Sequence, residues 1–184
     1  RQGLAIREWG HKQLEGGFEG IPAERDVLVS ALKDMMKNKK FAGKSAVVHI
    51  PPQNISSFPI RFHVRETESI ESVIVRESKG YIPFPVNEAI IDYPSTAATA
   101  VGDGDQYTAT VIAVHKDTIK QYLLMLKQAG LSAEIIDFGL SSLIRLHQHL
   151  YTAIHEPAIL CHIGHTQSLL SIVSNDTIFA QRHV

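Results

Sequence analysis

The sequence contains few of the residues that mark several common protein classes. It has one cysteine among 184 residues, so no disulfide can form within the chain. Its 18 basic and 19 acidic residues nearly cancel, which excludes the positively charged surface that nucleic-acid binding requires. No apolar run reaches the roughly 18 residues that cross a membrane as a helix. These absences are typical of a globular protein from a reducing compartment.

Recognisable catalytic and metal-binding patterns are also missing. No Gly-x-Ser-x-Gly string is present. His147 and His149 lie two residues apart on a predicted helix and point in different directions, and His162 and His165 have no acidic or cysteine neighbour in the sequence. A zinc site needs three or four convergent ligands, so we assign no metal ligand and no catalytic residue. Cys161 lies in an apolar run and is predicted to be a buried structural thiol.

Apolar periodicity and turn residues predict a series of strands and helices. The predicted helices cover about 22–40, 67–79, 117–129 and the segment after Asp137, and the predicted strands cover 46–50, 58–62, 89–93, 107–114, 133–136, 157–163, 168–173 and 177–180. Asp117 is placed as the N-cap of its helix. Small residues with Asp and Gly between 95 and 105 predict a solvated loop.

The order of these elements indicates an insertion. Between about 56 and 136 the order is β-α-β-β-α-β, and strand–helix passes lie on both sides of it. A small α+β module inserted into an α/β domain explains this order better than one continuous parallel sheet. The predicted domains are therefore 1–55 as part of a first subdomain, 56–136 as the inserted subdomain, 137–156 as a connecting helix and 157–184 as the start of a second subdomain.

One segment carries a more specific signature. Tyr81-Ile82-Pro83-Phe84-Pro85 is followed by Asn87-Glu88-Ala89-Ile90-Ile91-Asp92-Tyr93. A proline fixes its own φ and favours extended geometry in the residue before it, so this segment ends a helix and starts a strand. As a string it resembles the IPFP…EAxxDY signature of the PilM family of type IV pilus assembly. The resemblance implies an α/β fold, namely a partial actin-like (ribonuclease H-like) fold with an inserted small α+β subdomain.

Other strings in the same order extend the resemblance over about residues 4–184. They are Val111-Ile112-Ala113-Val114, Ala129-Gly130-Leu131, Ile135-Ile136-Asp137 and the segment 175–182, which resembles the family's NGxxxFxR turn and strand. Each string is short, but their order and spacing together favour the family. The family's first phosphate loop would lie before Leu4 and its adenosine pocket after Val184. We therefore expect the chain to be a fragment that lacks both ends.

The hairpin near the end of the sequence is the candidate nucleotide site. In actin-like ATPases a loop of the type Asp-Ile-Gly-x-x-x-Thr wraps the terminal phosphates, and the corresponding string here runs from His162 to Ser168. The glycine is kept and Ser168 replaces threonine, but His162 replaces the aspartate that helps to position Mg²⁺. A neutral imidazole is a poor ligand for this hard cation. By resemblance, the cofactor-binding residues are Gly164, His165, Thr166, Gln167 and Ser168.

Three interpretations of this loop stay open. It is a plain β-hairpin, a degenerate phosphate loop whose backbone N–H groups still contact phosphate, or an active loop, and His162 disfavours the last. The resemblance implies ATP and Mg²⁺ as cofactors of a full-length protein, and we expect neither to bind this fragment. Whether the protein is an enzyme is left uncertain; the most that these residues allow is a weak ATPase.

The resemblance implies a cytoplasmic scaffold of type IV pilus assembly. Its expected partner is the N-terminal cytoplasmic tail of an inner-membrane pilus protein of the PilN type, which would hold it at the membrane indirectly. The tail would dock as an extended peptide near the inserted subdomain. Self-association is left open, and nucleic acid is not expected as a partner. The alternatives are an active ATPase or phosphotransferase of the same superfold, an FtsA-like division protein, or the cytoplasmic part of a type II secretion protein.

Overall fold

The chain forms two compact units that are each made of two separate stretches of sequence. The computed structural model describes residues 6, 8–13, 21–38, 41–93, 96–101, 104–151, 156–164, 168–174 and 177–183. Unit 1 comprises Arg1–Val48 and Asp117–Ile136, and unit 2 comprises His49–Lys116 and Asp137–Val184. These units do not coincide with the four predicted segments 1–55, 56–136, 137–156 and 157–184, which stay a prediction about domain organisation.

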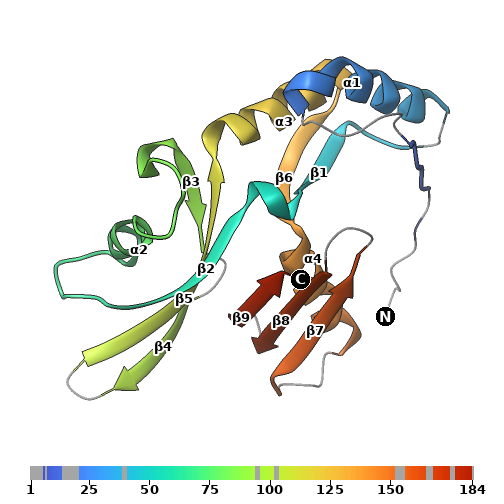
Figure 1. The fold of residues 1–184 in the computed structure, drawn as a ribbon. Coiled ribbons are helices and arrows are strands. Elements are labelled where there is room, and N and C mark those ends of the chain that lie inside the picture. Colours follow the sequence, from blue (N-terminus) through green and yellow to red (C-terminus); the bar gives the residue numbers. More distant parts are fainter. Residues whose placement is uncertain are drawn as a thin grey trace. The chain divides into compact units, whose positions relative to one another are not determined.

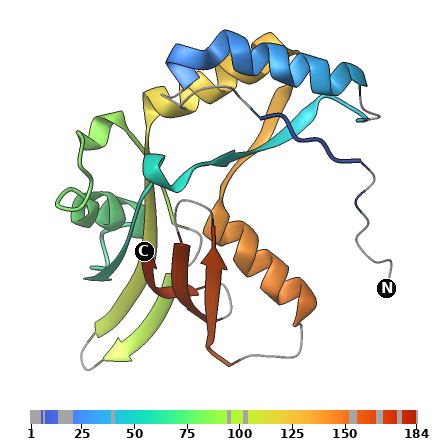
Figure 2. The same cartoon turned by 45° about the vertical axis from the view of Figure 1, so that its right-hand side comes forward.

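Unit 1 is built from two helices and most of a two-stranded sheet. Helix α1 spans Ile21–Asn38, α3 spans Lys116–Ala129, and strand β1 (Ser45–Ile50) pairs with β6 (Ser132–Phe138). The two helices lie side by side (Figures 1 and 2), and the Arg25 guanidinium of α1 donates a hydrogen bond to Gln121 of α3.

The two ends of α3 can be compared with the predicted N-cap and the predicted C-terminal stop of this helix. Asp117 lies inside the first turn of α3, so its prediction as an N-cap was wrong. Gly130 follows the last helical residue with a φ of 81°, a left-handed conformation that glycine adopts without steric cost. The predicted stop at Gly130 is confirmed.

The first sheet of unit 2 has one long central strand. Strand β5 (Gly104–His115) pairs antiparallel with β2 (Ser56–His63) on one side, and with β3 (Ala89–Asp92) and β4 (Thr96–Val101) on the other. The pairing of β4 runs from Thr96 opposite Ala109 to Val101 opposite Gly104. The predicted loop over 95–105 was therefore wrong at 96–101, which form β4, and at 104–105, which begin β5. Pairing between the two strands compensates for the weak β-propensity of the Ala-rich sequence.

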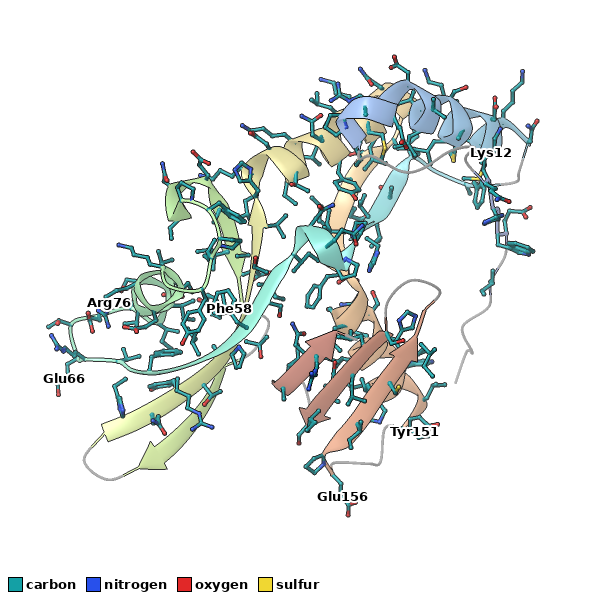
Figure 3. The ribbon with its side chains drawn as sticks, viewed as in Figure 1. Lys12, Phe58, Glu66, Arg76, Tyr151 and Glu156 are labelled. Carbon is teal, nitrogen blue, oxygen red and sulfur yellow. The ribbon has the colours of Figure 1, made fainter. Side chains whose placement is uncertain are left out.

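Helix α2 (Ile70–Ser78) covers one face of this sheet. Its N-cap is Ser69, whose Oγ accepts a hydrogen bond from the Ser72 N–H at 3.2 Å. The core between helix and sheet consists of Ile60, Phe62, Val73, Ile74, Ala109 and Val111, all buried. Figure 3 shows Phe58 on the α2 side of β2, where its ring stacks on Tyr81 with 4.9 Å between the ring centroids.

The proline-rich segment behaves as its residues predict. After α2 the chain turns through Tyr81–Pro85, forms a short 3₁₀ helix η2 (Val86–Glu88) and enters β3 at Ala89. The Pro85 φ of −57° and ψ of 132° show the extended geometry that ends one element and begins the next.

The second sheet of unit 2 is a three-stranded antiparallel meander. Strands β7 (Ala158–Ile163), β8 (Ser168–Ser174) and β9 (Thr177–His183) follow in that order, and α4 (Gly139–Leu150) packs on one face. The Thr110 hydroxyl of β5 donates to the Ile178 carbonyl of β9 at 2.7 Å, so β9 is tied to the first sheet. Cys161 is exposed on β7, and its prediction as a buried thiol was wrong, because none of the described residues covers the face of the sheet on which it lies.

None of the helices in the described part of the chain combines the length and the apolar character that a membrane-crossing helix needs.

Candidate functional site

Unit 2 contains a pocket of about 650 Å³ at the point where β1, α4 and the β7–β8 hairpin meet. Every described residue that lines it belongs to this unit. Its lining residues are His49, Pro51, Pro52, Gln53, Ile55, Ser57, Phe138, Gly139, Leu140, Ser142, Leu143, Leu146, His162, Gly164, Ser168, Leu169 and Gln181. The 3₁₀ helix η1 (Pro52–Asn54) brings the prolines and Gln53 to one side of the pocket.

Two of the five predicted cofactor-binding residues line this pocket. Gly164 and Ser168 lie there at the ends of β7 and β8, together with His162. The other three, His165, Thr166 and Gln167, lie outside the described residues. The assignment of the whole loop as a cofactor site stays a prediction, but its two described ends border a cavity.

Helix α4 begins at the pocket. Its N-cap is Phe138, which is extended and whose side chain caps no backbone N–H. The next residue, Gly139, lies against His49: a Cβ at this position would come within 3.0 Å of His49 Nε2. The absence of a side chain at residue 139 therefore leaves room for the imidazole between the end of β1 and the first turn of α4.

The carboxylate nearest in sequence to the start of α4, that of Asp137, already accepts hydrogen bonds from other residues. Asp137 is 8% exposed and accepts hydrogen bonds from the Phe138 N–H at 2.8 Å, the Ser142 hydroxyl at 2.8 Å and the Arg145 guanidinium. Burial alone would raise the pKa of Asp137, but these hydrogen bonds and the charge of Arg145 outweigh it and hold the pKa below its ordinary value. Asp137 thus stays ionised and ties β6 to α4 instead of lining the pocket.

The described lining of the pocket does not fit a magnesium nucleotide. It contains no Asp, Glu, Lys or Arg, and most of it is apolar. Mg²⁺ binds through carboxylates and water, and phosphate is commonly held by Lys, Arg or a dense set of N–H groups. In the part of the chain that the structure describes, no group of three or more His, Cys, Asp and Glu residues could hold a metal ion. The described lining therefore supplies neither a carboxylate for Mg²⁺ nor a cationic side chain for phosphate.

Most of this pocket was not predicted from the sequence. The hairpin at 162–168 was identified, but the stretch 49–57, the start of α4 and Gln181, which come from distant parts of the chain, were not. Gln181 donates from Nε2 to the Ser57 carbonyl at 3.2 Å and so joins β9 to β2 beside the cavity. The doublet Pro51-Pro52 after an apolar strand was the one available signal, since it marks a rigid turn at the end of β1.

Comparison with known proteins gives one family. A family model described as type IV pilus assembly protein PilM matches residues 4–184. No curated protein matches at a significant level. Among solved structures, the chain is similar to one titled "PilM-PilN type IV pilus biogenesis complex", with a TM-score of 0.77 and 23% identity over 95% of this chain and 52% of that one.

A second similar structure is the cytoplasmic domain of EpsL, described as an inner-membrane component of the type II secretion system of Vibrio cholerae. Its TM-score is 0.51 and its identity 14%, over 85% of this chain and 56% of that one. The chain thus spans about half the length of both structures. At these identities the likeness shows the fold, and the predicted α/β, partial actin-like fold is confirmed.

Proposed function

The chain belongs to the PilM family of type IV pilus assembly proteins, and from this premise we propose that it is an actin-like scaffold with a degenerate nucleotide site. Its partner is the N-terminal cytoplasmic tail of an inner-membrane pilus protein of the PilN type. The similar solved structure is titled as a PilM–PilN complex, which supports this choice of partner. The scaffold itself is cytoplasmic and reaches the inner membrane through that tail.

The observation that carries the proposal is the chemistry of the pocket around Gly164. His162 stands where the family's loop has aspartate, and the described lining offers neither a carboxylate for Mg²⁺ nor a cation for phosphate. Asp137, the carboxylate next to α4, is held by Arg145 and Ser142. A site of this composition does not support efficient hydrolysis of ATP, so the protein acts through binding.

The inserted subdomain offers an edge for an extended tail. Strand β3 pairs with β5 on one side, and on its other side the described residues contain no partner strand. Ile90 is exposed on β3, and Asn87 is exposed in η2 just before it. A peptide that adds to this edge would gain main-chain hydrogen bonds, while exposed side chains such as Ile90 would provide specificity.

The test is a calorimetric titration with a synthetic peptide of the PilN-type tail from the same organism. Asn87→Arg places a long charged side chain beside the β3 edge and should weaken the tail about fivefold or more, an effect of roughly 1 kcal/mol. Asn38→Arg, at the exposed end of α1, is the matched control and should leave the affinity unchanged. Equal affinity of both variants and the wild type would reject the β3 edge as the docking surface.

The variant His162→Asp separates two interpretations of the hairpin. If the loop is a degenerate phosphate loop, restoring the carboxylate should raise its affinity for Mg²⁺ with ATP, as measured by calorimetry. If it is a plain hairpin, the variant should bind no better than the wild type. Neither result bears on the binding of the tail, which the peptide titration tests separately.

A further inference from the structure

Unit 1 carries unpaired positive charge at one end of its two helices. The charges nearly cancel over the whole chain, but four exposed lysines of this unit have no carboxylate at ion-pair distance among the described residues. They are Lys33 and Lys37 of α1, Lys44 just before β1, and Lys127 of α3. We call these four residues the lysine face.

The carboxylates closest in sequence to the lysine face do not neutralise it. Asp34 of α1 pairs with Lys12, with 3.6 Å between the carboxylate oxygen and the lysine nitrogen. Glu134 lies on β6, in the sheet and not in the helix layer. Asp26 and Asp117 lie near the N-terminal ends of α1 and α3, away from these lysines along each helix. The positive charge of the lysine face is therefore not balanced within the described part of the chain.

The geometry of the two helices brings lysines from both of them together. Helices α1 and α3 run side by side in the same direction (Figures 1 and 2), and the hydrogen bond from Arg25 to Gln121 sets their relative level. At a rise of about 1.5 Å per residue, Lys33 lies about 12 Å beyond this bond along α1 and Lys127 about 9 Å beyond it along α3. The two lysines therefore stand at nearly the same level on neighbouring helices.

The segment that contains Lys44 reaches the same end of the helices. The Lys44 carbonyl accepts a hydrogen bond from the Ser132 N–H at 2.8 Å, just after the end of α3. Lys37 lies in the last turn of α1. In the sequence, Lys39 and Lys40 stand between Lys37 and Lys44, but both lie outside the described residues. The lysine face thus spans the C-terminal ends of both helices and the segment before β1.

The helix dipole accounts for only part of this arrangement. It favours cations in the last turn of a helix, which suits Lys37 and Lys127 but not the other two lysines. Exposed apolar residues lie beside Lys127, since Leu123 and Leu124, one turn before it on α3, are 42% and 44% exposed. Lysine is almost never buried without a partner, so a surface of unpaired lysines is one that stays in water or meets anions.

We propose that the lysine face contacts the lipid headgroups of an anionic membrane, while Leu123 and Leu124 reach between the headgroups. The four lysines are spread over two helices and the segment before β1 instead of converging on one point, so they match an extended anionic surface better than a small anion. Long lysine side chains beside exposed leucines also suit a helix that lies on a membrane surface. This contact adds to the proposed attachment through the tail, but it is tested without the tail, so either proposal can fail alone.

The first experiment is cosedimentation of the chain, at about 0.1 M salt, with vesicles of phosphatidylglycerol and phosphatidylcholine in equal parts. Each lysine near such a surface strengthens binding about fivefold, so four lysines predict half-maximal binding at about 2 mM anionic lipid. Vesicles of phosphatidylcholine alone should not bind the chain. Salt at about 1 M, where the Debye length is about 3 Å, should release the chain from the anionic vesicles.

The second experiment reverses the charge of the lysine face. The triple variant Lys33→Glu, Lys37→Glu and Lys127→Glu should bind the anionic vesicles at least about a hundredfold more weakly than the wild type, because three attractive charges become repulsive. All three side chains are exposed, and thermal unfolding checks that the variant is folded.

The matched control makes the same change in net charge within unit 2. It combines Arg61→Glu, Arg65→Glu and Lys79→Glu, all at exposed positions. It should bind within about threefold of the wild type, because salt screens charges that lie outside the contact. A further variant, Leu123→Gln with Leu124→Gln, should bind about threefold more weakly, since less apolar area enters the headgroup layer.

Four results would overturn the proposal. The first is no binding to the anionic vesicles at up to about 10 mM lipid, and the second is equal binding by the wild type and the triple lysine variant. The third is a control variant that loses as much affinity as the triple lysine variant, since binding would then follow net charge alone. The fourth is a leucine variant that binds as tightly as the wild type, because the leucines would then not reach the headgroups.

Discussion

The two sheets of unit 2 differ in how completely they are covered. In the first, β5 has strands on both sides and α2 on one face, and Val73, Ile74, Ala109 and Val111 have no exposed surface. In the second, α4 packs on one face, and among the described residues of the other face Ile159 and Ile163 are exposed. Buried apolar side chains of the first sheet stabilise the fold, and residues of the second sheet contribute to the lining of the pocket.

Residues of the same type therefore contribute differently to stability in the two sheets. Ile74 is fully buried beneath the first sheet, whereas Ile159 is 69% exposed on the second. Free energy is gained only from apolar area that folding removes from water, at about 25 cal/mol per Å². The first sheet should contribute most of the stability of unit 2, and substitutions of exposed residues such as Ile159 should change that stability little.

The largest predicted effect is the loss of stability when a buried isoleucine of the first sheet is truncated. Ile74→Ala should lower the free energy of unfolding by about 3 kcal/mol, since it removes buried methyl groups and leaves a cavity. Ile159→Ala should lower it by less than about 0.5 kcal/mol, because most of that side chain is already in water. Urea denaturation of both variants measures the difference, and similar losses at the two positions would refute the contrast.

The next effect concerns Asp137, which joins β6 to α4. Asp137→Asn should cost about 2 kcal/mol at pH 7, because it weakens the charge-assisted hydrogen bonds from Arg145 and Ser142. The pKa of Asp137 is lowered in the folded state, so this stabilisation is complete above the unfolded pKa of about 3.9. It is lost as the pH falls from that value through the folded pKa.

The measurement for Asp137 is the difference in unfolding free energy between wild type and Asp137→Asn from pH 7 to pH 3. We expect a constant difference above about pH 5 and a shrinking one below about pH 4. A difference that grew on acidification would mean that Asp137 is protonated in the folded protein, contrary to the hydrogen bonds described above.

The smallest predicted effect is that of a substitution in the pocket, at Gly139 beside His49. Gly139→Ala places a methyl group near His49 Nε2, while alanine favours a helix over glycine by up to about 1 kcal/mol. We expect a net change in unfolding free energy below about 1 kcal/mol, together with shifted NMR signals of the His49 imidazole. Gly80→Ala, at a glycine with open space around it, should leave those signals in place. Unchanged His49 signals in Gly139→Ala would show that the ring does not lie against α4.

Local chemistry in the sequence was enough to predict α2 and the strands β2, β3 and β5 of the first sheet. Prolines around Phe84 and the apolar period of α2 act within a few residues, so they could be interpreted without the fold. The strand β4 was missed, because its Thr and Ala residues become a strand only through pairing with β5. The exposure of Cys161 was missed for a similar reason, since an apolar strand gives no sign of which of its faces is covered.

The pocket was only partly predictable. Its hairpin was found through resemblance to a family loop, whereas His49 and Gln181 reach it through the topology of strands that are far apart in the sequence. No local pattern in the sequence indicates that Gly139 makes room for His49. Residues that meet through tertiary packing have no fixed spacing, and therefore the sequence alone indicated the loop but not the cavity.

The central claim is that this PilM-family chain works by binding a PilN-type tail and not by turning over nucleotide. The most direct measurement titrates one preparation of the chain, by calorimetry, first with the tail peptide and then with ATP and Mg²⁺, while phosphate release is followed. The account predicts micromolar binding of the peptide, no measurable heat with the nucleotide and no release of phosphate. Micromolar binding of ATP with Mg²⁺-dependent phosphate release, and no binding of the peptide, would contradict it.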